Sequence, residues 1–509
     1  MTRHRQARAT DERAPRRGLV ERYVDSVAGR VGAGSGLYKA LRKVFPHHFS
    51  FLWGEIALYS FVVLLATGTY LTLFFEGSQE VVTYDGSYTP LRGVEVSAAY
   101  ESVMRISFDV KGGMLIRQMH HWAALIFIGA IALHLARVFF TGAFRKPREI
   151  NWVVGVLLLI LSLAAGFTGY SLPDDLLSGT GLRITQAIIL ALPLIGERTT
   201  YLLFGGEWPG TDIIGRLYPV HILLIPAAIV GLLTVHLMLV WRQKHTQFTG
   251  RGATERNVVG ERIWPTFAMK SVGLLFLVAG VVAAMGALFE VNAVWLYGPY
   301  DVAAATSYSQ PDWYIGFLEG SLRLFPPWET RLFGYSINNL IYSGVLIPGV
   351  IFTGLLLVPW IERRFTRDKA DVDREHHLLD RPRDAPHRTA AGVASIAFVS
   401  VLFLGGSQDV IAGTLEVSIG YVTTFLQVAA LVAPPLAYVG TYHVCRVLGR
   451  REGPERTERA GIVVRDSGGG YHGVGETELD ADGERTDTSS GASTAESERL
   501  RERAGALGD

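Results

Sequence analysis

The chain has 509 residues, 49% of them hydrophobic, and a formal net charge of only +1 at pH 7. Soluble domains are seldom so apolar over such a length, so the composition predicts a protein of the lipid membrane with no nucleic-acid partner. The single cysteine, Cys445, excludes a disulfide within the chain, a four-cysteine iron–sulfur cluster and a covalently attached c-type haem.

Charged residues are concentrated at the two ends of the chain. Residues 1–50 are basic and polar, and residues 446–509 are charged and rich in glycine and serine. Such compositions are typical of solvated segments, and we expect the tail to be largely disordered.

Between these ends, eight stretches are apolar enough to cross a membrane as helices of about 20 residues. They are 51–75, 119–141, 152–172, 217–241, 268–290, 336–360, 391–405 and 419–442. The seventh is short. Two further apolar stretches, near 184–195 and 313–325, are interrupted by proline or charge and are predicted to be surface helices between spans. The fold class is therefore an all-α, polytopic membrane protein.

The positive charges of the short loops predict the orientation. Arg and Lys residues cluster in the loops after spans two, four and six. Such loops face the cytoplasm, which would place both termini there as well. The four alternate loops, at 76–118, 173–216, 291–335 and 406–418, would then face outward.

Spans two and four each contain two histidines at matched spacing. His120 and His134 are 14 residues apart, and His221 and His236 are 15 apart. Either gap keeps both members on roughly one face of a helix, about 21 Å apart along its axis. Two such helices side by side would pair His120 with His221 and His134 with His236. Neutral imidazole is a good axial ligand for haem iron, so we expect two haems stacked across the membrane.

Two further patterns fit this arrangement. Arg117 lies one turn before His120 and Arg137 one turn after His134, where haem propionates would need cationic partners. Snorkelling at the membrane surface would explain the same two arginines. Glycines that would let a planar ring approach the backbone recur at the histidine interval in spans one and three: Gly54 with Gly68, and Gly155 with Gly169.

The loop after span five carries a candidate site for a quinol. Its sequence SQPDWYIGFLEG contains Asp312 and Glu319. A carboxylate at the outer membrane edge can accept a proton from a quinol that is being oxidised. If the segment is helical, the two carboxylates share a face. We expect Glu319 to contact the head group, with Asp312 set further back as a relay. Two ordinary charges at the membrane surface would explain the same spacing.

Together these residues resemble the cytochrome b family, the membrane core of quinol:cytochrome c oxidoreductases. The resemblance covers about residues 45–445. It is carried by R-x-x-H-x13-H-x-x-R at 117–137, H-x4-P-x9-H at 221–236, the paired glycines, GYSLP at 169–173 and PDWY at 311–314. The last motif is similar to the family's Pro-Glu-Trp-Tyr signature, with Asp in place of Glu.

Several segments look like the actinobacterial branch of this family, whose complexes oxidise menaquinol. They include FLWGEIALYSFVVLL, TGAFRKPREINWV and YSLPDDLLSG. The resemblance implies that menaquinol binds near Pro311, Tyr314, Glu319 and Tyr170. One electron would go to a Rieske iron–sulfur subunit, and the other would pass through two non-covalent b-type haems to an inner quinone site.

The inner quinone site departs from the family pattern. Mitochondrial relatives use a Lys-Asp pair at the start of span five, whereas here Lys270 is followed by Ser271. Lys270 is kept as a candidate quinone-binding residue. The proton donor stays open. His376 and His377 lie on the same membrane side and could substitute, but two histidines in a loop are more often simply solvated.

The resemblance further implies a bacterial plasma-membrane location. The expected partners are a di-haem cytochrome c subunit, a terminal cytochrome c oxidase and a second copy of the chain in a homodimeric core. Residues 51–241 would form a haem-binding four-helix bundle and residues 242–445 the C-terminal membrane part. Two alternatives remain: a di-haem anchor subunit of a quinone-linked dehydrogenase, and a transporter or scaffold with buried histidines.

Overall fold

The computed structural model describes residues 40–304, 310–366 and 368–451, together with residue 26 and the backbone of three strands between 459 and 486. Eight helices in this part of the chain are long and apolar enough to cross a membrane. Their bounds are Phe49–Leu71 (η1 Phe49–Phe51 and α3 Leu52–Leu71), Gly113–Phe140 (α5), Glu149–Ser171 (α6), Ile213–Gln243 (α9 Ile213–Pro219, η3 Val220–Leu224 and α10 Ile225–Gln243), Ile263–Leu288 (η4 Ile263–Phe267 and α11 Ala268–Leu288), Asn339–Phe365 (α14 Asn339–Ile341, η6 Tyr342–Leu346 and α15 Ile347–Phe365), Pro386–Gly406 (α17) and Ile419–Gly449 of α19, which runs over Ile419–Arg451.

All eight predicted spans are confirmed, and most are longer than their apolar windows. The seventh, expected over 391–405, runs over 21 residues from Pro386. At about 1.5 Å per residue this is roughly 31 Å, enough to cross the hydrocarbon core of a bilayer.

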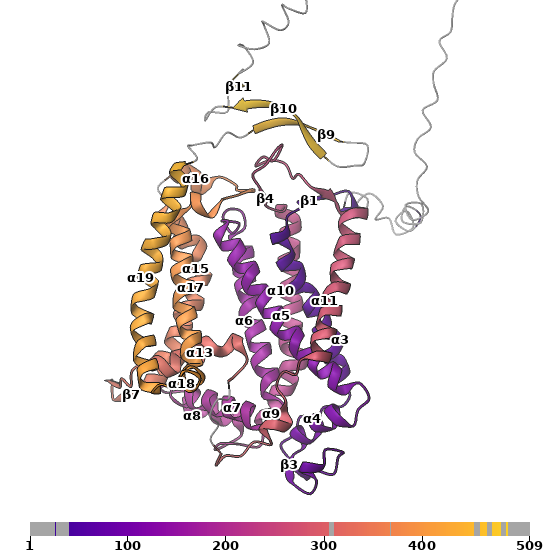
Figure 1. Cartoon of the computed structure of the whole chain (residues 1–509), viewed down its shortest axis with the longest axis vertical. Coiled ribbons are helices and arrows are strands. Elements are labelled where there is room, and N and C mark those ends of the chain that lie inside the picture. Colours follow the sequence, from indigo (N-terminus) through magenta and orange to yellow (C-terminus); the bar gives the residue numbers. More distant parts are fainter. Residues whose placement is uncertain are drawn as a thin grey trace, which may run out of the picture.

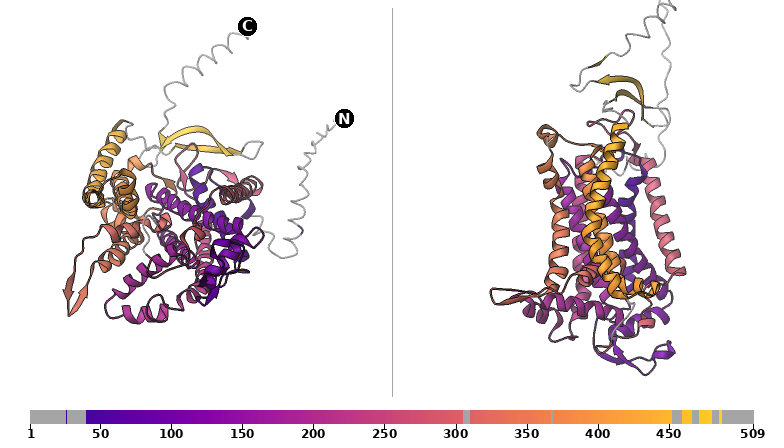
Figure 2. Two further views of the ribbon diagram at one scale, coloured as in Figure 1. Left: turned by 60° about the horizontal axis from the view of Figure 1, so that its bottom comes forward. Right: turned by 60° about the vertical axis from the view of Figure 1, so that its left-hand side comes forward.

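The spans run side by side in two groups (Figure 1). In the first group α3 packs on α5, α10 on α6, and α11 against both α3 and α5. Its centre is a buried cluster that includes Phe61, Phe127 and Ile229. In the second group α17 packs on α19 around Val401, Leu402 and Leu426, with α15 beside them (Figure 2).

In spans four and six, a turn with one extra residue lies just before a proline. Pro226 has no N–H to bond the carbonyl four residues earlier. In η3 the N–H of Ile225 instead bonds Val220, five residues back, so the helix is locally π-helical. The same occurs in η6 before Pro348, where Ile347 bonds Tyr342. Each of these turns holds one residue more than a regular α-helical turn, so the residues that follow are shifted by one position around the helix.

The loops after spans one, three, five and seven lie at one end of the molecule and carry short helices (Figure 1). These are α4 Ala98–Phe108, α7 Leu176–Leu190, α8 Gly196–Phe204, α12 Val294–Tyr297, η5 Trp313–Ile315, α13 Gly316–Leu324 and α18 Gln408–Leu415, together with η2 Thr89–Leu91. The two predicted helices between spans are confirmed as α7 and α13. Two antiparallel hairpins lie in the same loops, β2 Val81–Thr83 with β3 Glu95–Ser97 and β6 Thr330–Leu332 with β7 Tyr335–Ile337.

At the opposite end, short strand pairs tie distant loops together. The antiparallel pair β1 Val44–Phe45 and β5 Glu261–Arg262 joins the segment before span one to that before span five. The parallel pair β4 Gln247–Phe248 and β8 Leu378–Leu379 joins the loops after spans four and six. The short helices α16 Lys369–Asp373 and η7 Pro382–Asp384 lie at this end as well.

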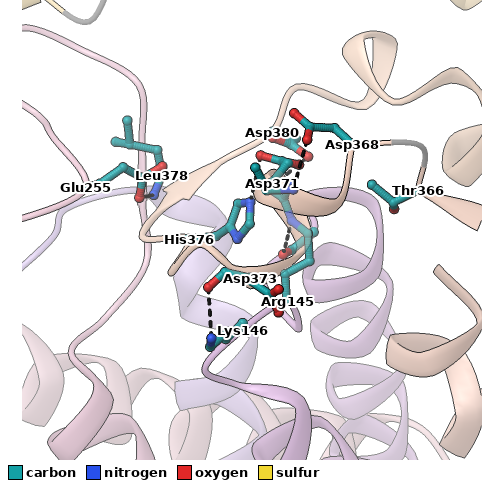
Figure 3. A network of polar contacts seen from close by, with 12 residues as sticks. Arg145, Lys146, Glu255, Thr366, Asp368, Asp371, Asp373, His376, Leu378 and Asp380 are labelled. Carbon is teal, nitrogen blue, oxygen red and sulfur yellow. Dashed lines mark hydrogen bonds and ion pairs between the residues drawn. The ribbon is translucent and has the colours of Figure 1, made fainter. Parts of the chain in front are cut away.

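Polar contacts reinforce this end of the molecule (Figure 3). Arg145, after span two, pairs with Asp380 at 2.9 Å, and Lys146 donates to the carbonyl of Asp373 at 2.8 Å. Glu255, after span four, accepts a hydrogen bond from the N–H of Leu378 at 2.9 Å. The three positively charged loops therefore meet at one end, as the predicted orientation requires.

His376 and His377 belong to this network. Both are buried, so the expectation of solvated loop histidines is wrong. His377 Nδ1 lies 2.8 Å from Arg148, and His376 lies 3.4 Å from the carboxylate of Asp371. These contacts hold loops together.

The predicted tail over 446–509 begins within α19 and contains three described strands. They are β9 Arg459–Arg465, β10 Tyr471–Leu479 and β11 Arg485–Thr486, in one antiparallel sheet with β10 in the middle. The predicted disorder of the remaining tail, and the character of residues 1–39 apart from residue 26, fall outside the described residues.

Candidate functional site

The four histidines of spans two and four face one another in two pairs. The ring centroids of His120 and His221 are 6.3 Å apart, and those of His134 and His236 are 6.4 Å apart. A bond from a metal to an imidazole nitrogen is about 2 Å long. Two imidazoles that bind one ion from opposite sides therefore have centroids about 6 Å apart, so each pair has the spacing of a bis-histidine site.

The extra residue in η3 explains how unequal spacings produce matched pairs. The 14-residue interval of α5 falls about 40° short of four full turns, whereas a 15-residue interval would overshoot by about 60°. His221 lies inside η3, whose π-turn absorbs one residue. The His221–His236 interval then has the phase of 14 residues, and both pairs meet.

The four predicted glycines lie against the histidine rings. A Cβ built on Gly68 would lie 3.1 Å from His120 Cε1, and one on Gly169 would lie 2.4 Å from His221 Cε1. A Cβ on Gly54 would lie 3.1 Å from His134, and one on Gly155 would lie 3.9 Å from His236. Glycine therefore makes room for the imidazoles that would carry the iron.

Hydroxyl groups fix His120 and His221, the pair that the predicted orientation places toward the outside. Thr67 Oγ1 lies 2.9 Å from His120 Nδ1. His221 Nδ1 is 3.0 Å from the carbonyl of Ala165 and 3.2 Å from Thr168 Oγ1. An imidazole whose Nδ1 is bonded outward presents Nε2 to a metal. Sequence reasoning missed both threonines, although each directly precedes a site glycine.

The arginines provide an independent test of whether haem fits. In Arg117, Nη1 bonds the carbonyl of Asn292, but Nε and Nη2 are buried and have no hydrogen-bond partner among the described residues. The buried Nε of Arg137 is likewise unpaired within that part of the chain. Buried cationic donors of this kind call for an anion. Two carboxylates from a haem would satisfy them.

A cavity surrounds the inner pair. Its lining includes His134, His236, Arg137, Asn151, His245 and Thr246. His245 lies beyond the end of span four. Its burial, with Arg137 nearby, lowers the pKa of the imidazole to about 3, so His245 is neutral. The residues present at both pairs fit a haem with two propionates.

At the outer end, Asp312 joins a short network that includes a histidine from span two. His121 Nε2 lies 2.8 Å from Asp312 Oδ1 and 3.0 Å from Oδ2. The hydroxyl of Tyr314 donates to Oδ2 at 2.9 Å, and burial raises the pKa of that phenol well above its ordinary value. In the sequence, His121 only adjoins the predicted ligand His120 and has no partner at the same interval, because the residue 14 positions on is Leu135. Its contact joins positions 191 residues apart, which spacing alone does not reveal.

The PDWY segment, residues 311–314, lies between spans two and three. A Cβ on Gly166 would lie 2.7 Å from the Tyr314 ring, and one on Gly129 would lie 3.6 Å from Trp313. Asp312 precedes the helical turn η5 and has extended backbone, with φ −50° and ψ 140°. Asp312 and Glu319 therefore do not share a helical face, because the helix that holds Glu319, α13, begins at Gly316.

Glu319 lies in a second polar group. It forms an ion pair with Arg323, which also binds Asp409 of α18 at 2.8 Å. The Oε2 atom of Glu319 is buried without a hydrogen-bond partner among the described residues. Burial raises the pKa of Glu319 to about 7, against the opposing effect of Arg323. Such a carboxyl can exchange a proton near neutral pH.

The remaining predicted residues are placed as follows. Pro311 directly precedes Asp312, and Tyr170 is buried with its hydroxyl donating to the carbonyl of Leu177 at 3.1 Å. Lys270 lies at the other end of the molecule, where Nζ binds both oxygens of Glu261 at 2.6 and 2.8 Å. Tyr170 and Lys270 are thus each already bonded within the protein.

Comparisons with known proteins agree with this geometry. Residues 125–299 match the family described as cytochrome b(N-terminal)/b6/petB. The cytochrome bc1 complex cytochrome b subunit of Streptomyces coelicolor is 47% identical over 447 residues, which is 87% of this chain and 81% of that protein. The protein of the same name from Mycobacterium tuberculosis is 49% identical over 456 residues, 89% of this chain and 82% of its own.

A relative from Corynebacterium diphtheriae with that name is 48% identical over 441 residues, covering 86% of this chain and 81% of its own. Among solved structures, a chain of a hyperthermophilic respiratory Complex III superposes with a TM-score of 0.59 at 19% identity, covering 82% of this chain and all of that one. At this identity the last match concerns the fold alone.

Proposed function

This chain belongs to the cytochrome b subunits of bc1-type respiratory complexes, and from that premise we propose that it binds two b-type haems and oxidises menaquinol at its outer end. The observation that carries the proposal is the pairing of four histidines at 6.3 and 6.4 Å across two neighbouring spans. When bound, two haems stacked in this way supply one-electron carriers between the two membrane faces.

The protein residues around each pair have separable tasks. His120, His134, His221 and His236 would hold the two haem irons. Thr67 and Thr168 orient the imidazoles of His120 and His221. Arg117 and Arg137 would hold the propionates, and the four glycines keep the space around the rings open.

At the outer end, the polar residues accept the protons that a quinol loses. Oxidation of a quinol releases two electrons and two protons. Glu319, with a pKa raised to about 7 and a buried oxygen without a partner among the described residues, is suited to bind a quinol hydroxyl and take up its proton. Asp312, held by His121 and Tyr314, serves as the relay.

Partner chains complete the reaction. With one cysteine, this chain cannot build the iron–sulfur and c-type centres that carry the other electron away. For this reason we assign it Rieske and di-haem cytochrome c partners and, from its family, a terminal oxidase and a homodimeric core. Residues 51–241 serve as the haem-binding bundle and residues 242–445 as the part that holds the outer quinol segment.

The bacterial relatives support a location in the bacterial plasma membrane, and the charge of the loops supports an orientation with the Arg145–Arg148 end in the cytoplasm. Purification in mild detergent tests the whole proposal. We expect two b-type haems per chain, co-purifying cytochrome c and Rieske subunits, and cytochrome c reduction by a menaquinol analogue. A preparation without a b-type visible spectrum would contradict the proposal, and two haems without cytochrome c reduction would indicate a dehydrogenase anchor.

A further inference from the structure

A carboxylate lies inside the first membrane span, on the face that meets span five. Glu55 of α3 accepts a hydrogen bond from Ser271 of α11 through Oε2 at 2.7 Å. One turn further along α3, the hydroxyl of Tyr59 is hydrogen-bonded to Ser271 Oγ. Because Ser271 donates to Glu55, Tyr59 donates to Ser271, and the three groups form a chain that ends on the carboxylate. Ionisable groups within membrane spans are costly and commonly functional.

These three side chains lie at the level of the inner histidine pair, His134 and His236. Gly54, the residue before Glu55, is the glycine against the His134 ring, at 3.1 Å from a Cβ built on it. The helices α3 and α11 pack on each other, and the hydrogen bond from Ser271 to Glu55 joins them at this level. The carboxylate is therefore close to the inner haem position and far from the outer quinol segment.

The three side chains are also reachable from the lipid phase. Glu55, Tyr59 and Ser271 are each half-buried. Around them the surface is apolar, since Leu52 is 40% exposed and Val272 49%. An apolar quinone dissolved in the membrane could bring its head group to this cluster.

Lys270 is poorly placed for the same task. Its side chain is 52% exposed, and its ammonium group is already bonded to both oxygens of Glu261. The aspartate that the resemblance predicts after Lys270 is replaced by Ser271. In this chain the facing helix supplies the carboxylate, Glu55, and Ser271 is hydrogen-bonded to it.

We propose that Glu55, Ser271 and Tyr59 form the head-group site of the inner quinone, and that Glu55 donates one of the two protons of its reduction. The inference rests on the proposed function. Two electrons, delivered one at a time by the b-type haem at His134 and His236, and two protons convert both quinone carbonyls to hydroxyls. Glu55 gives its proton to one carbonyl oxygen. The resulting carboxylate is stabilised by the Ser271 hydroxyl and is reprotonated from the aqueous phase, which also supplies the second proton.

The test uses the purified complex with an outer-site inhibitor bound, so that reduced b-type haem is reoxidised only through the inner site. A menaquinone analogue is added and haem reoxidation is followed optically. We expect Glu55→Gln and Ser271→Ala to slow reoxidation at least tenfold and fivefold, Glu55→Asp to recover most of the rate, and Glu149→Gln, a carboxylate at the same end on α6, to behave as wild type.

A second readout is independent of turnover. The infrared difference spectrum between the quinone and quinol states should contain a carboxyl C=O band that Glu55→Gln removes and Glu149→Gln retains. Unchanged visible spectra of both haems would show that the variants are assembled. If Glu55→Gln does not assemble, Ser271→Ala carries the test, and a wild-type rate there overturns the proposal.

Two outcomes separate this inference from the proposed function. Wild-type rates in Glu55→Gln together with a slow Lys270→Gln variant would overturn the inference and assign the site to Lys270. A wild-type complex that lacks two b-type haems would instead overturn the proposed function, and this inference with it.

Discussion

The carboxylate of Asp312 is hydrogen-bonded to His121, the residue next to His120, which we propose as a haem ligand, with Nε2 of His121 2.8 Å from Oδ1. His121 projects about 100° away from His120 around α5. Neighbouring positions of one helix can therefore serve two different sites, the outer haem and the quinol-binding segment.

Replacing His121 should affect quinol oxidation and leave both haems bound. In His121→Phe, Asp312 loses one of its two side-chain partners, which costs about 1–3 kcal/mol. If the whole loss falls on the reaction barrier, the rate decreases roughly 5- to 150-fold. Quinol oxidation kinetics and reduced-minus-oxidised spectra check this, and loss of the outer haem in this variant would show that His121 supports the ligand.

Loss of a haem ligand should remove one haem selectively. His134→Leu or His236→Leu should remove the inner haem, and His120→Leu or His221→Leu the outer one. The reason is that each ring faces only its own partner, at 6.4 and 6.3 Å. Redox titration of the visible spectrum separates the two haems, and a variant that retains both at wild-type potentials would exclude that histidine as a ligand.

The π-turn should be removable together with its extra residue. Deleting Leu223 shortens the His221–His236 interval to 14 residues, and Pro226→Ala lets the N–H at that position bond as in a regular α-helix. We expect the double variant to retain both haems. Deletion of Leu223 with Pro226 kept should displace His221 and reduce outer-haem content, measured by haem extraction and spectra. Equal haem content in the single and the double variant would contradict the claim that the π-turn absorbs the extra residue.

Glu319 should give quinol oxidation its pH dependence near neutrality. Burial raises the pKa of Glu319 to about 7, so the ionised form that accepts a proton decreases as pH falls through 7. The rate should decrease in the same range, and Glu319→Gln should slow oxidation and abolish this limb. In Asp409→Asn the Arg323 charge is no longer shared with Asp409, so the pKa of Glu319 should fall. The decrease in rate should then occur at lower pH. Full turnover in Glu319→Gln would make Glu319 an ordinary interfacial charge.

The orientation can be tested with introduced cysteines, since the native Cys445 is buried. Ala303→Cys, in the loop after span five, should react with an impermeant thiol reagent added outside intact cells. Gly250→Cys, in the loop after span four, should react only after the cells are opened. The reverse pattern would invert the topology predicted from the loop charges.

The spans and the histidine pairs could be predicted from the sequence because both are local properties. An apolar window of about 20 residues defines a span, and a repeat of 14 or 15 residues defines a helix face. The partner of Asp312 could not be predicted in this way, because His121 reaches it only where the segment after span five returns into the bundle. Glu319 and Arg323, by contrast, are a local pair four residues apart on α13. The conditional expectation that Asp312 and Glu319 share a helix face was wrong because the helix begins after Asp312.

The same reasoning explains why Glu55 was missed. Its partner Ser271 is 216 residues away, and a single glutamate near the start of an apolar span has the pattern of an interfacial charge. The departure from the family at Ser271 was visible in the sequence. The residue that compensates for it became apparent only from the packing of α3 on α11.

Arg148 has a consequence for the order in which the molecule can be completed. Its guanidinium donates to the carbonyls of His376 at 2.6 Å, Gln243 at 3.1 Å and Lys244 at 3.0 Å, and it lies 2.8 Å from His377 Nδ1. Half of these partners are synthesised only after span six has left the ribosome. The cavity around His134 and His236, which Arg148 lines, is therefore completed late in biosynthesis, after spans one to four have been made. A haem bound by this pair could enter before Arg148 has all its partners.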